Sequence, residues 1–162
     1  MIFSNWQLCK DLVEVVLQGE EVSNQIRTEE IGGKASQLAA IAEVRAALMT
    51  RLRAFAQLPG LVADGRDLGT VVFPNAQLKI YLTASAEERA KRRLEQLRAK
   101  GVAAKICDLK KDIQARDERD SSRANAPLMA AADAIQLDST QLSPSQVVDF
   151  ILAQAKERGL TS

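Results

Sequence analysis

Apolar and polar positions alternate along the chain with two periods, one typical of strands and one typical of helices. Short runs rich in β-branched residues and bounded by turn residues predict strands; they lie at 12–17, within 20–27, and at 61–63, 78–83 and 134–138. Longer stretches with helical spacing and capping residues predict helices; they lie at 28–40, 43–57, 85–100, 105–123 and 143–159. Because strands and helices alternate over 61–159, we expect an α/β fold with a mainly parallel sheet flanked by helices.

Two helices carry apolar stripes that we expect to face the core. The stripe of the helix at 43–57 consists of Val44, Leu48, Leu52 and Phe55. The stripe of the C-terminal helix consists of Val147, Val148, Ile151 and Leu152. Arg45 lies off the first stripe, so the pattern by itself indicates a solvated helix charge rather than a ligand.

The helix at 105–123 has one face that changes character along its length. At about 100° per residue, this face begins with three apolar residues: Ile106, Leu109 and Ile113. The same direction continues through three charged residues: Arg116, Asp120 and Arg123. Buried charges are costly unless they are paired or border a polar cavity. We therefore expect this face to border a site where two arginines beside an aspartate bind an anion; the alternative is that the helix extends beyond the core and the three side chains are solvated.

The loop at 64–69 places charged residues between two glycines, directly after the expected strand at 61–63. In open α/β sheets, ligands bind beyond the carboxyl ends of the strands. Arg66 offers a planar fork of donors for phosphate or carboxylate, and Asp67 offers acceptors. We expect a binding site here, with a simple solvated loop as the alternative.

Composition limits the classes of function. The chain of 162 residues fits one domain with a sizeable core, and its 46% hydrophobic and 27% charged residues are typical of globular proteins. With a net charge of +1 and no apolar run of membrane-spanning length, we expect neither nucleic acid nor a membrane as partner, although the helix at 85–100 is basic. The absence of histidine excludes histidine-based triads and histidine metal ligands. Cys9 and Cys107 lack metal-ligand spacing and are interpreted as free thiols of a cytoplasmic protein.

Several separated motifs make the sequence similar to the bacterial cytidylate kinase family, and the similarity covers nearly the whole chain. The motifs lie at 22–23, 26–28, 35–37, 64–74, 116–123 and 138–140. The resemblance implies a P-loop nucleoside monophosphate kinase with a three-layer α/β/α fold. Such enzymes transfer the γ-phosphoryl group of ATP to CMP or dCMP with Mg²⁺.

The resemblance also implies a division of the chain and a set of site residues. Residues 1–162 would form a single kinase domain, with 1–34 in the monophosphate-binding insertion, 35–85 and 124–162 in the core, and 86–123 in a lid-like helical hairpin. The CMP site would consist of Ser36, Arg45, Arg66, Asp67, Arg116, Asp120 and Arg123, with arginines near the phosphate and acids toward base or sugar. Arg92 would approach the phosphates of ATP. No residue is implied as acid or base, because phosphoryl transfer works mainly through positioning and charge stabilisation.

The sequence departs from the family at the P-loop. Family members begin with a strand, a glycine-rich P-loop and a helix, whereas the G-x-x-x-x-G-K-[ST] pattern fails at Gly33-Lys34, which has Thr28 five residues before Gly33 and Ala35 after the lysine. We therefore expect an incomplete kinase domain, impaired phosphoryl transfer, and self-association through an exposed sheet. Two alternatives to an active kinase remain: a non-catalytic nucleotide-binding remnant and an interaction module.

Overall fold

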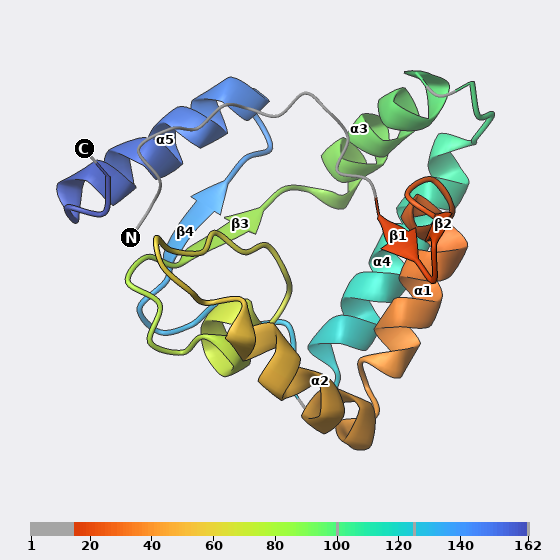
Figure 1. Cartoon of the computed structure of the whole chain (residues 1–162). Coiled ribbons are helices and arrows are strands. Elements are labelled where there is room, and N and C mark those ends of the chain that lie inside the picture. The colour runs from red at the N-terminus through yellow and green to blue at the C-terminus, as the bar shows by residue number, and fades with distance from the viewer. Residues whose placement is uncertain (1–14, 100, 125, 162) are drawn as a thin grey trace.

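The computed structural model describes residues 15–99, 101–124 and 126–161, in which short strands alternate with helices (Figure 1). The strands are β1 (Val16–Leu17), β2 (Glu20–Glu21), β3 (Ile80–Thr83) and β4 (Ile135–Asp138). The α-helices are α1 (Glu29–Leu38), α2 (Ala42–Ala54), α3 (Ala86–Ala99), α4 (Ile106–Ser121) and α5 (Pro144–Glu157). A 3₁₀ turn, η1 (Gln25–Arg27), precedes α1, and a single π-helical turn, η2 (Leu68–Val72), precedes β3. None of the helices described is both long and apolar enough to cross a membrane.

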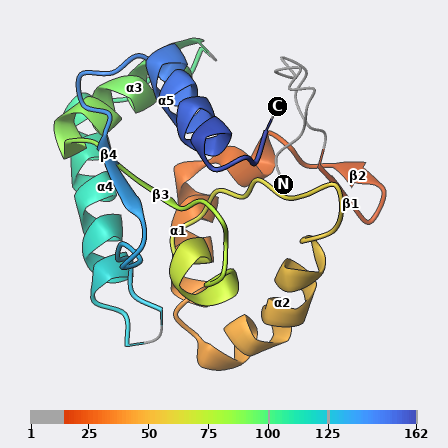
Figure 2. The same cartoon turned by 90° about the vertical axis from the view of Figure 1, so that its left-hand side faces the viewer.

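The alternation of strands and helices correctly predicts a parallel sheet. β3 and β4 pair in parallel, with Ile80 opposite Ile135 and Thr83 opposite Asp138. β1 and β2 form a separate antiparallel hairpin; residues 12–14 of the expected first strand, and Cys9, lie outside the described residues. α5 runs beside the β3–β4 sheet, and α3 and α4 lie together at the end of the sheet where β3 leads into α3 (Figure 2). The fold is therefore α/β, with a small parallel sheet.

An apolar cluster holds α3 against α4. It consists of the buried residues Ala90, Leu94 and Leu109, with Leu97, Ala104 and Ile113 packed around them. The turn between the helices depends on Gly101, whose φ of +71° favours glycine and allows the Val102 N–H to bond to the Leu97 carbonyl at 2.9 Å. Ile106 is 41% exposed, so the inward stripe of α4 begins one turn later than expected.

The predicted helix caps form to different extents. Ser143 and Gln146 cap the N-terminus of α5 reciprocally. At α3, Ser85 Oγ accepts the Glu88 N–H at 3.1 Å, but the Glu88 carboxylate accepts a hydrogen bond from Arg92 Nε at 3.0 Å. The Ser85 N–H donates instead to Thr140 Oγ1 at 3.0 Å. One half of the expected capping box is thus replaced by an i,i+4 ion pair.

The prediction of a buried strand at 61–63 is wrong. These residues are irregular, and Leu61 and Val62 are 38% and 53% exposed. A strand requires a neighbouring backbone to complete its hydrogen bonds. Within the described residues, 61–63 pair with no strand, so a short apolar run is not enough to form one.

The predicted apolar stripe of α2 does not face a core. Leu48, Leu52 and Phe55 are 48%, 37% and 57% exposed, and no residue of α2 is buried. Arg53 instead donates from Nε to the Val72 carbonyl at 3.2 Å and from Nη2 to the Val71 carbonyl at 3.3 Å. The charged face of α2 therefore contacts η2, opposite to the prediction from the pattern. In α5, Val148 is also more exposed than expected, at 42%.

Candidate functional site

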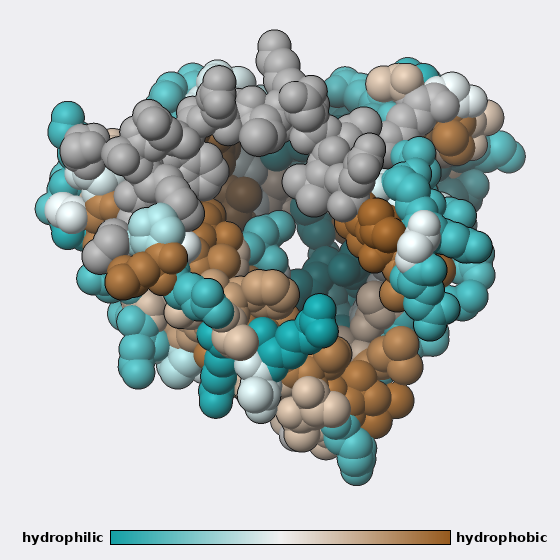
Figure 3. Space-filling view, in the orientation of Figure 1, coloured by the Kyte–Doolittle hydropathy of each residue, from teal (hydrophilic) through white to brown (hydrophobic). Residues whose placement is uncertain are grey.

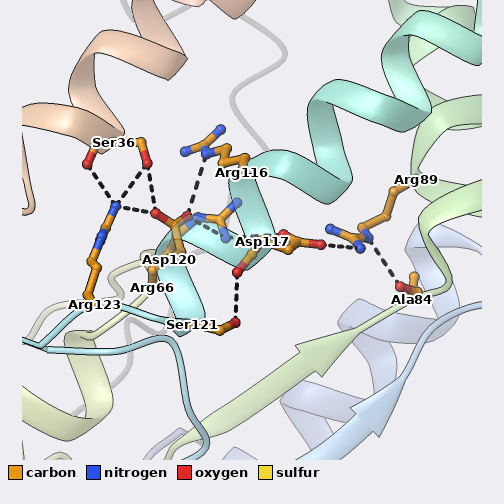
Figure 4. A network of polar contacts seen from close by, with 9 residues as sticks. All are labelled: Ser36, Arg66, Ala84, Arg89, Arg116, Asp117, Asp120, Ser121 and Arg123. Atoms are coloured by element: carbon orange, nitrogen blue, oxygen red, sulfur yellow. Dashed lines mark hydrogen bonds and ion pairs between the residues drawn. The ribbon is translucent and has the colours of Figure 1, made fainter.

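Asp120, in the last turn of α4, is completely buried at the centre of a polar network (Figure 4). Ser36 of α1 donates through Oγ to Asp120 Oδ1 at 2.8 Å, and Arg123 donates to the same oxygen. Arg66 Nη1 lies 2.7 Å from Asp120 Oδ2, and Arg116 Nε lies 3.7 Å from it. Side chains from α1, from the loop before η2 and from the end of α4 therefore converge on one carboxylate.

The position of Asp120 follows from the helix period and from the packing of α1 on α4. Asp120 lies two turns after Ile113, so its side chain points in nearly the same direction. Contact between α1 and α4 brings the buried Ser36 beside it. α4 ends at Ser121, and Arg123 then turns back so that Nη2 donates to Oγ and to the carbonyl oxygen of Ser36, each at 2.9 Å. Burial of Asp120 and Arg123 rules out the solvated alternative for these two side chains.

Asp117, one turn before Asp120, extends the network toward α3. Its Oδ1 accepts a hydrogen bond from Arg66 Nη1 at 3.4 Å, and its Oδ2 accepts one from Arg89 Nη2 at 2.6 Å. Burial by itself raises the pKa of Asp117, but hydrogen bonds from Arg89 and Arg66 and their positive charges outweigh burial and hold the pKa below its usual range. Asp117 is therefore a carboxylate at neutral pH.

A second ion pair lies next to the network, because it contains Asp67, the residue that follows Arg66 in the chain. The Asp67 carboxylate pairs with Arg45 of α2, and the two side chains are only 16% and 15% exposed. The Asp67 carbonyl accepts the Val71 N–H at 2.9 Å, which fixes the start of η2. The pattern-based expectation that Arg45 is a solvated helix charge is therefore wrong.

Arg92 lies apart from the Asp120 network. Its Nη2 donates to the Ser139 carbonyl at 2.6 Å and to the Leu142 carbonyl at 3.3 Å, and its Nη1 donates to Ser139 Oγ at 3.2 Å. These contacts attach α3 to the turn between β4 and α5. Here Arg92 fixes a backbone turn, and its expected approach to ATP phosphates stays a prediction.

The structure thus brings four of the candidate residues around the carboxylate of a fifth, Asp120: Ser36, Arg66, Arg116 and Arg123. Their role in substrate binding stays a prediction. Sequence reasoning missed Asp117 and Arg89. Asp117 could have been found, since at 100° per residue it lies about 40° from Ile113, within the same helix face. No periodic signal marks Arg89, whose contact depends on the packing of α3 against α4.

Of two hollows that border the described residues, one adjoins the network. It has a volume of about 230 Å³ and is lined by Glu30, Gly33, Asp112, Ala115, Arg116 and Arg119. The other, of about 340 Å³, lies around Lys79 and includes none of the candidate residues. Arg116 therefore contacts Asp120 and also lines this hollow.

A parallel sheet flanked by helices, with arginines clustered on a buried carboxylate, defines an α/β protein suited to bind an anionic ligand. The sequence model of a family described as "Cytidylate kinase" matches residues 2–157. The chain belongs to the cytidylate kinase family.

Relatives named "Cytidylate kinase" are similar to most of this chain. The protein from Marinomonas sp. (strain MWYL1) is 61% identical over 148 residues, which is 91% of this chain and 65% of the relative. The protein from Pseudomonas fluorescens (strain Pf0-1) is 58% identical over 149 residues, 92% of this chain and 65% of the relative. The protein from Azotobacter vinelandii is 56% identical over 147 residues, which is 91% of this chain and 64% of the relative. The chain spans less than two thirds of the length of these relatives.

Proposed function

We propose that the network around Asp120 binds CMP or dCMP, and that the protein serves transfer of the γ-phosphoryl group of ATP to this nucleotide, giving CDP or dCDP. One observation supports the binding site: four guanidinium groups lie together around two carboxylates of α4. The groups are those of Arg66, Arg89, Arg116 and Arg123, and of Asp117 and Asp120. A phosphate monoester carries close to two negative charges at neutral pH, and guanidinium groups bind phosphate oxygens through charge-assisted hydrogen bonds. Family membership supports the choice of nucleotide.

Exposure suggests how the site residues divide their work. The side chains of Arg66 and Arg116 are 30% and 37% exposed, so they can reach a phosphate as they stand. Those of Arg123 and Asp120 are 8% and 0% exposed, so their first role is to orient their neighbours. Asp120 would reach the base or sugar only after its carboxylate is released by Arg66 and Arg116. Ser36 would then be released from its bond to Asp120.

The proposed reaction asks little covalent chemistry of the protein. Phosphoryl transfer is accelerated mainly by positioning the two nucleotides and stabilising charge on the transferred group, and arginines provide both. Mg²⁺ in such reactions is held largely by nucleotide phosphates. Within the described residues, no three acidic or thiol side chains are grouped so as to hold a metal ion, so we assign no residue of this chain to Mg²⁺.

The wider kinase architecture is also part of the proposal. A three-layer α/β/α arrangement would extend the two-stranded sheet, and α3 and α4 would act as a lid. For Arg92 to reach ATP phosphates, it would have to release the carbonyls of Ser139 and Leu142 that it now binds. Because the 162 residues contain no G-x-x-x-x-G-K-[ST] pattern, we propose that this polypeptide, assayed by itself, transfers phosphate poorly.

Isothermal titration of the 162-residue polypeptide with CMP, cytidine and ATP tests the binding site, and ADP release from Mg-ATP and CMP tests turnover. We expect CMP to bind more tightly than cytidine, because only CMP carries the phosphate that the clustered arginines can hold. Equal affinity for CMP and cytidine, or no binding of CMP, would contradict the proposed site. Turnover equal to that of a full-length relative would contradict the proposed impairment.

We also propose that the polypeptide associates with a second copy of itself. Apolar patches lie on either side of the central hollow of the face in Figure 3, with hydrophilic residues between them. Leu48, Phe55 and Leu58 are 48%, 57% and 83% exposed. Extended apolar exposure of this kind is uncommon on monomers. Sedimentation velocity over a range of concentrations should show a dimer or larger species, and a constant monomer would refute self-association.

A further inference from the structure

Arg66 is held by one of its nitrogens between two carboxylates of α4. Its Nη1 lies 2.7 Å from Asp120 Oδ2 and 3.4 Å from Asp117 Oδ1. Within the part of the chain that the structure describes, both contacts use Nη1, so Nη2 and Nε remain for other acceptors. The two acids therefore fix the direction of the guanidinium plane without using its whole fork.

Asp117 has a second arginine that connects it to a different part of the fold. Arg89, in the first turn of α3, donates from Nη2 to Asp117 Oδ2 at 2.6 Å. The same guanidinium donates from Nε to the Ala84 carbonyl at 3.1 Å, where β3 leads into α3. One carboxylate thus joins the loop that carries Arg66 to the junction between the sheet and α3 (Figure 4).

We propose that Asp117 is a positioning residue that holds Arg66 with Nη2 and Nε toward the substrate phosphate, and that ties this orientation to α3 through Arg89. The inference rests on the proposed CMP site. Asp117 acts through Arg66 and needs no contact with the nucleotide.

Two effects of removing the Asp117 charge have to be separated. Loss of a negative charge near the phosphate would by itself tighten CMP binding, whereas loss of the contact that orients Arg66 would weaken it. Only the second effect requires Arg66. A double-mutant cycle separates them, because in an Arg66→Met background only the charge effect remains.

The experiment is calorimetric titration of CMP into the full 162-residue chain and four variants: Asp117→Asn, Arg66→Met, the double variant, and Glu118→Gln. Glu118 is the next carboxylate along α4 and is exposed, so it is a matched control for charge. We expect the effect of Asp117→Asn on CMP affinity to differ about tenfold between the two backgrounds, with the weaker binding where Arg66 is present. A coupling of this size is usual for residues in direct contact. Glu118→Gln, made also in the Arg66→Met background as a fifth variant, should change CMP affinity equally in both backgrounds.

The outcomes distinguish this inference from the proposed function. If the parent binds CMP and Asp117→Asn changes its affinity by the same factor with and without Arg66, Asp117 contributes only charge and the inference is wrong. If the parent does not bind CMP, the proposed function fails and the inference fails with it. If Asp117→Asn does not fold, Arg89→Met replaces it in the double-mutant cycle. The link to α3 would then be wrong if Arg89→Met changes CMP affinity by the same factor with and without Arg66.

Discussion

α4 and α2 both carry an apolar stripe in the sequence, yet they are attached to the rest of the molecule in opposite ways. On α4 the stripe packs against α3 from Leu109 onward, and Leu109 is only 5% exposed. On α2 the stripe is open, with Leu48 at 48% exposure, and the contacts to η2 come from the charged side of the helix. Periodicity predicts that a helix forms, but segments distant in sequence determine which face of the helix is buried.

Arginines connect distant segments in both regions. Around α4, Arg66 reaches Asp117 across 51 positions and Arg123 reaches the carbonyl of Ser36 across 87. Around α2, Arg53 reaches the Val72 carbonyl across 19 positions. The two regions therefore differ in one respect: α4 combines apolar packing with ionic contacts, whereas α2 depends on polar contacts. Substitutions of matched residues in the two helices can test this difference.

The largest loss of stability should come from Asp120→Asn, which removes the carboxylate that the arginines at the end of α4 contact. Removing one partner of a buried ion pair typically costs about 3–5 kcal/mol, because the opposite charge is left uncompensated. Here Arg123, 8% exposed, is that charge. Urea unfolding followed by circular dichroism measures the change in the free energy of unfolding.

Asp112→Asn, at an exposed acid of the same helix, is the matched control and should change stability by less than about 0.5 kcal/mol. A loss for Asp120→Asn as small as that of the control would mean that the carboxylate is solvated and that α4 resembles α2.

The next largest effect on stability concerns the apolar stripes of α4 and α2. Leu109→Ala removes a buried side chain and should destabilise by about 2–5 kcal/mol, since a cavity is left between α3 and α4. Leu48→Ala removes the same atoms from the exposed stripe of α2 and should cost less than about 0.5 kcal/mol when both proteins are measured as monomers at high dilution. Similar losses at both positions in the monomer would show that another part of the same chain covers the stripe of α2.

These contrasts show how far the sequence predicts the fold. The helices and the cap at Ser143 depend on local patterns, and local patterns predict them correctly. The parallel pairing of β3 and β4 joins distant segments, but the alternation of strands and helices along the chain predicts it. The strand at 61–63 and the buried stripe of α2 are wrong because each needs a partner from elsewhere, and three apolar residues or one stripe do not identify that partner. Burial, unlike helix formation, is a long-range property.

The candidate site shows the same division. The ionic face of α4 could be predicted because Arg116, Asp120 and Arg123 continue an apolar stripe at helical spacing. The resemblance to a kinase family added Ser36 and Arg45, which no period marks. Arg89 was missed by both routes, since its contact with Asp117 arises only when α3 packs on α4.

The third effect is on ligand binding at the exposed edge of the network. Arg116→Met should weaken CMP binding by about 1.5–3 kcal/mol, the usual contribution of a hydrogen bond to a charged group. Arg98→Met, at an exposed position of α3, should leave the affinity unchanged. Calorimetry measures both, and the same CMP affinity in the two variants would exclude Arg116 from the site.

A smaller effect is expected where α2 meets η2. Arg53→Met removes the hydrogen bonds to the carbonyls of Val71 and Val72 and should destabilise by about 1 kcal/mol. Arg51→Met, an exposed arginine of the same helix, is the control and should have almost no effect. If both variants are as stable as the parent, α2 is held by contacts other than its charged face.

The smallest effect is a pH dependence of the link between α4 and α3. Because the pKa of Asp117 is held below its usual range by Arg89 and Arg66 against the opposing effect of burial, its contribution to stability is fully present above the unfolded value of about 3.9. The contribution is lost as the pH falls from there through the lower folded pKa, because the unfolded chain binds the proton first. The difference in unfolding free energy between the parent and Asp117→Asn should therefore be constant from about pH 7 to pH 5 and shrink below about pH 4.

Comparison with this variant isolates Asp117 from other acids that titrate in the same range, such as Asp133, whose pKa is lowered mainly by its hydrogen bond to Lys79. Urea unfolding of both proteins at several pH values gives the difference directly. A difference that grows as the pH falls would mean that protonation of Asp117 is favoured by folding. In that case the arginines do not compensate for burial, and α3 is held to α4 by the apolar cluster alone.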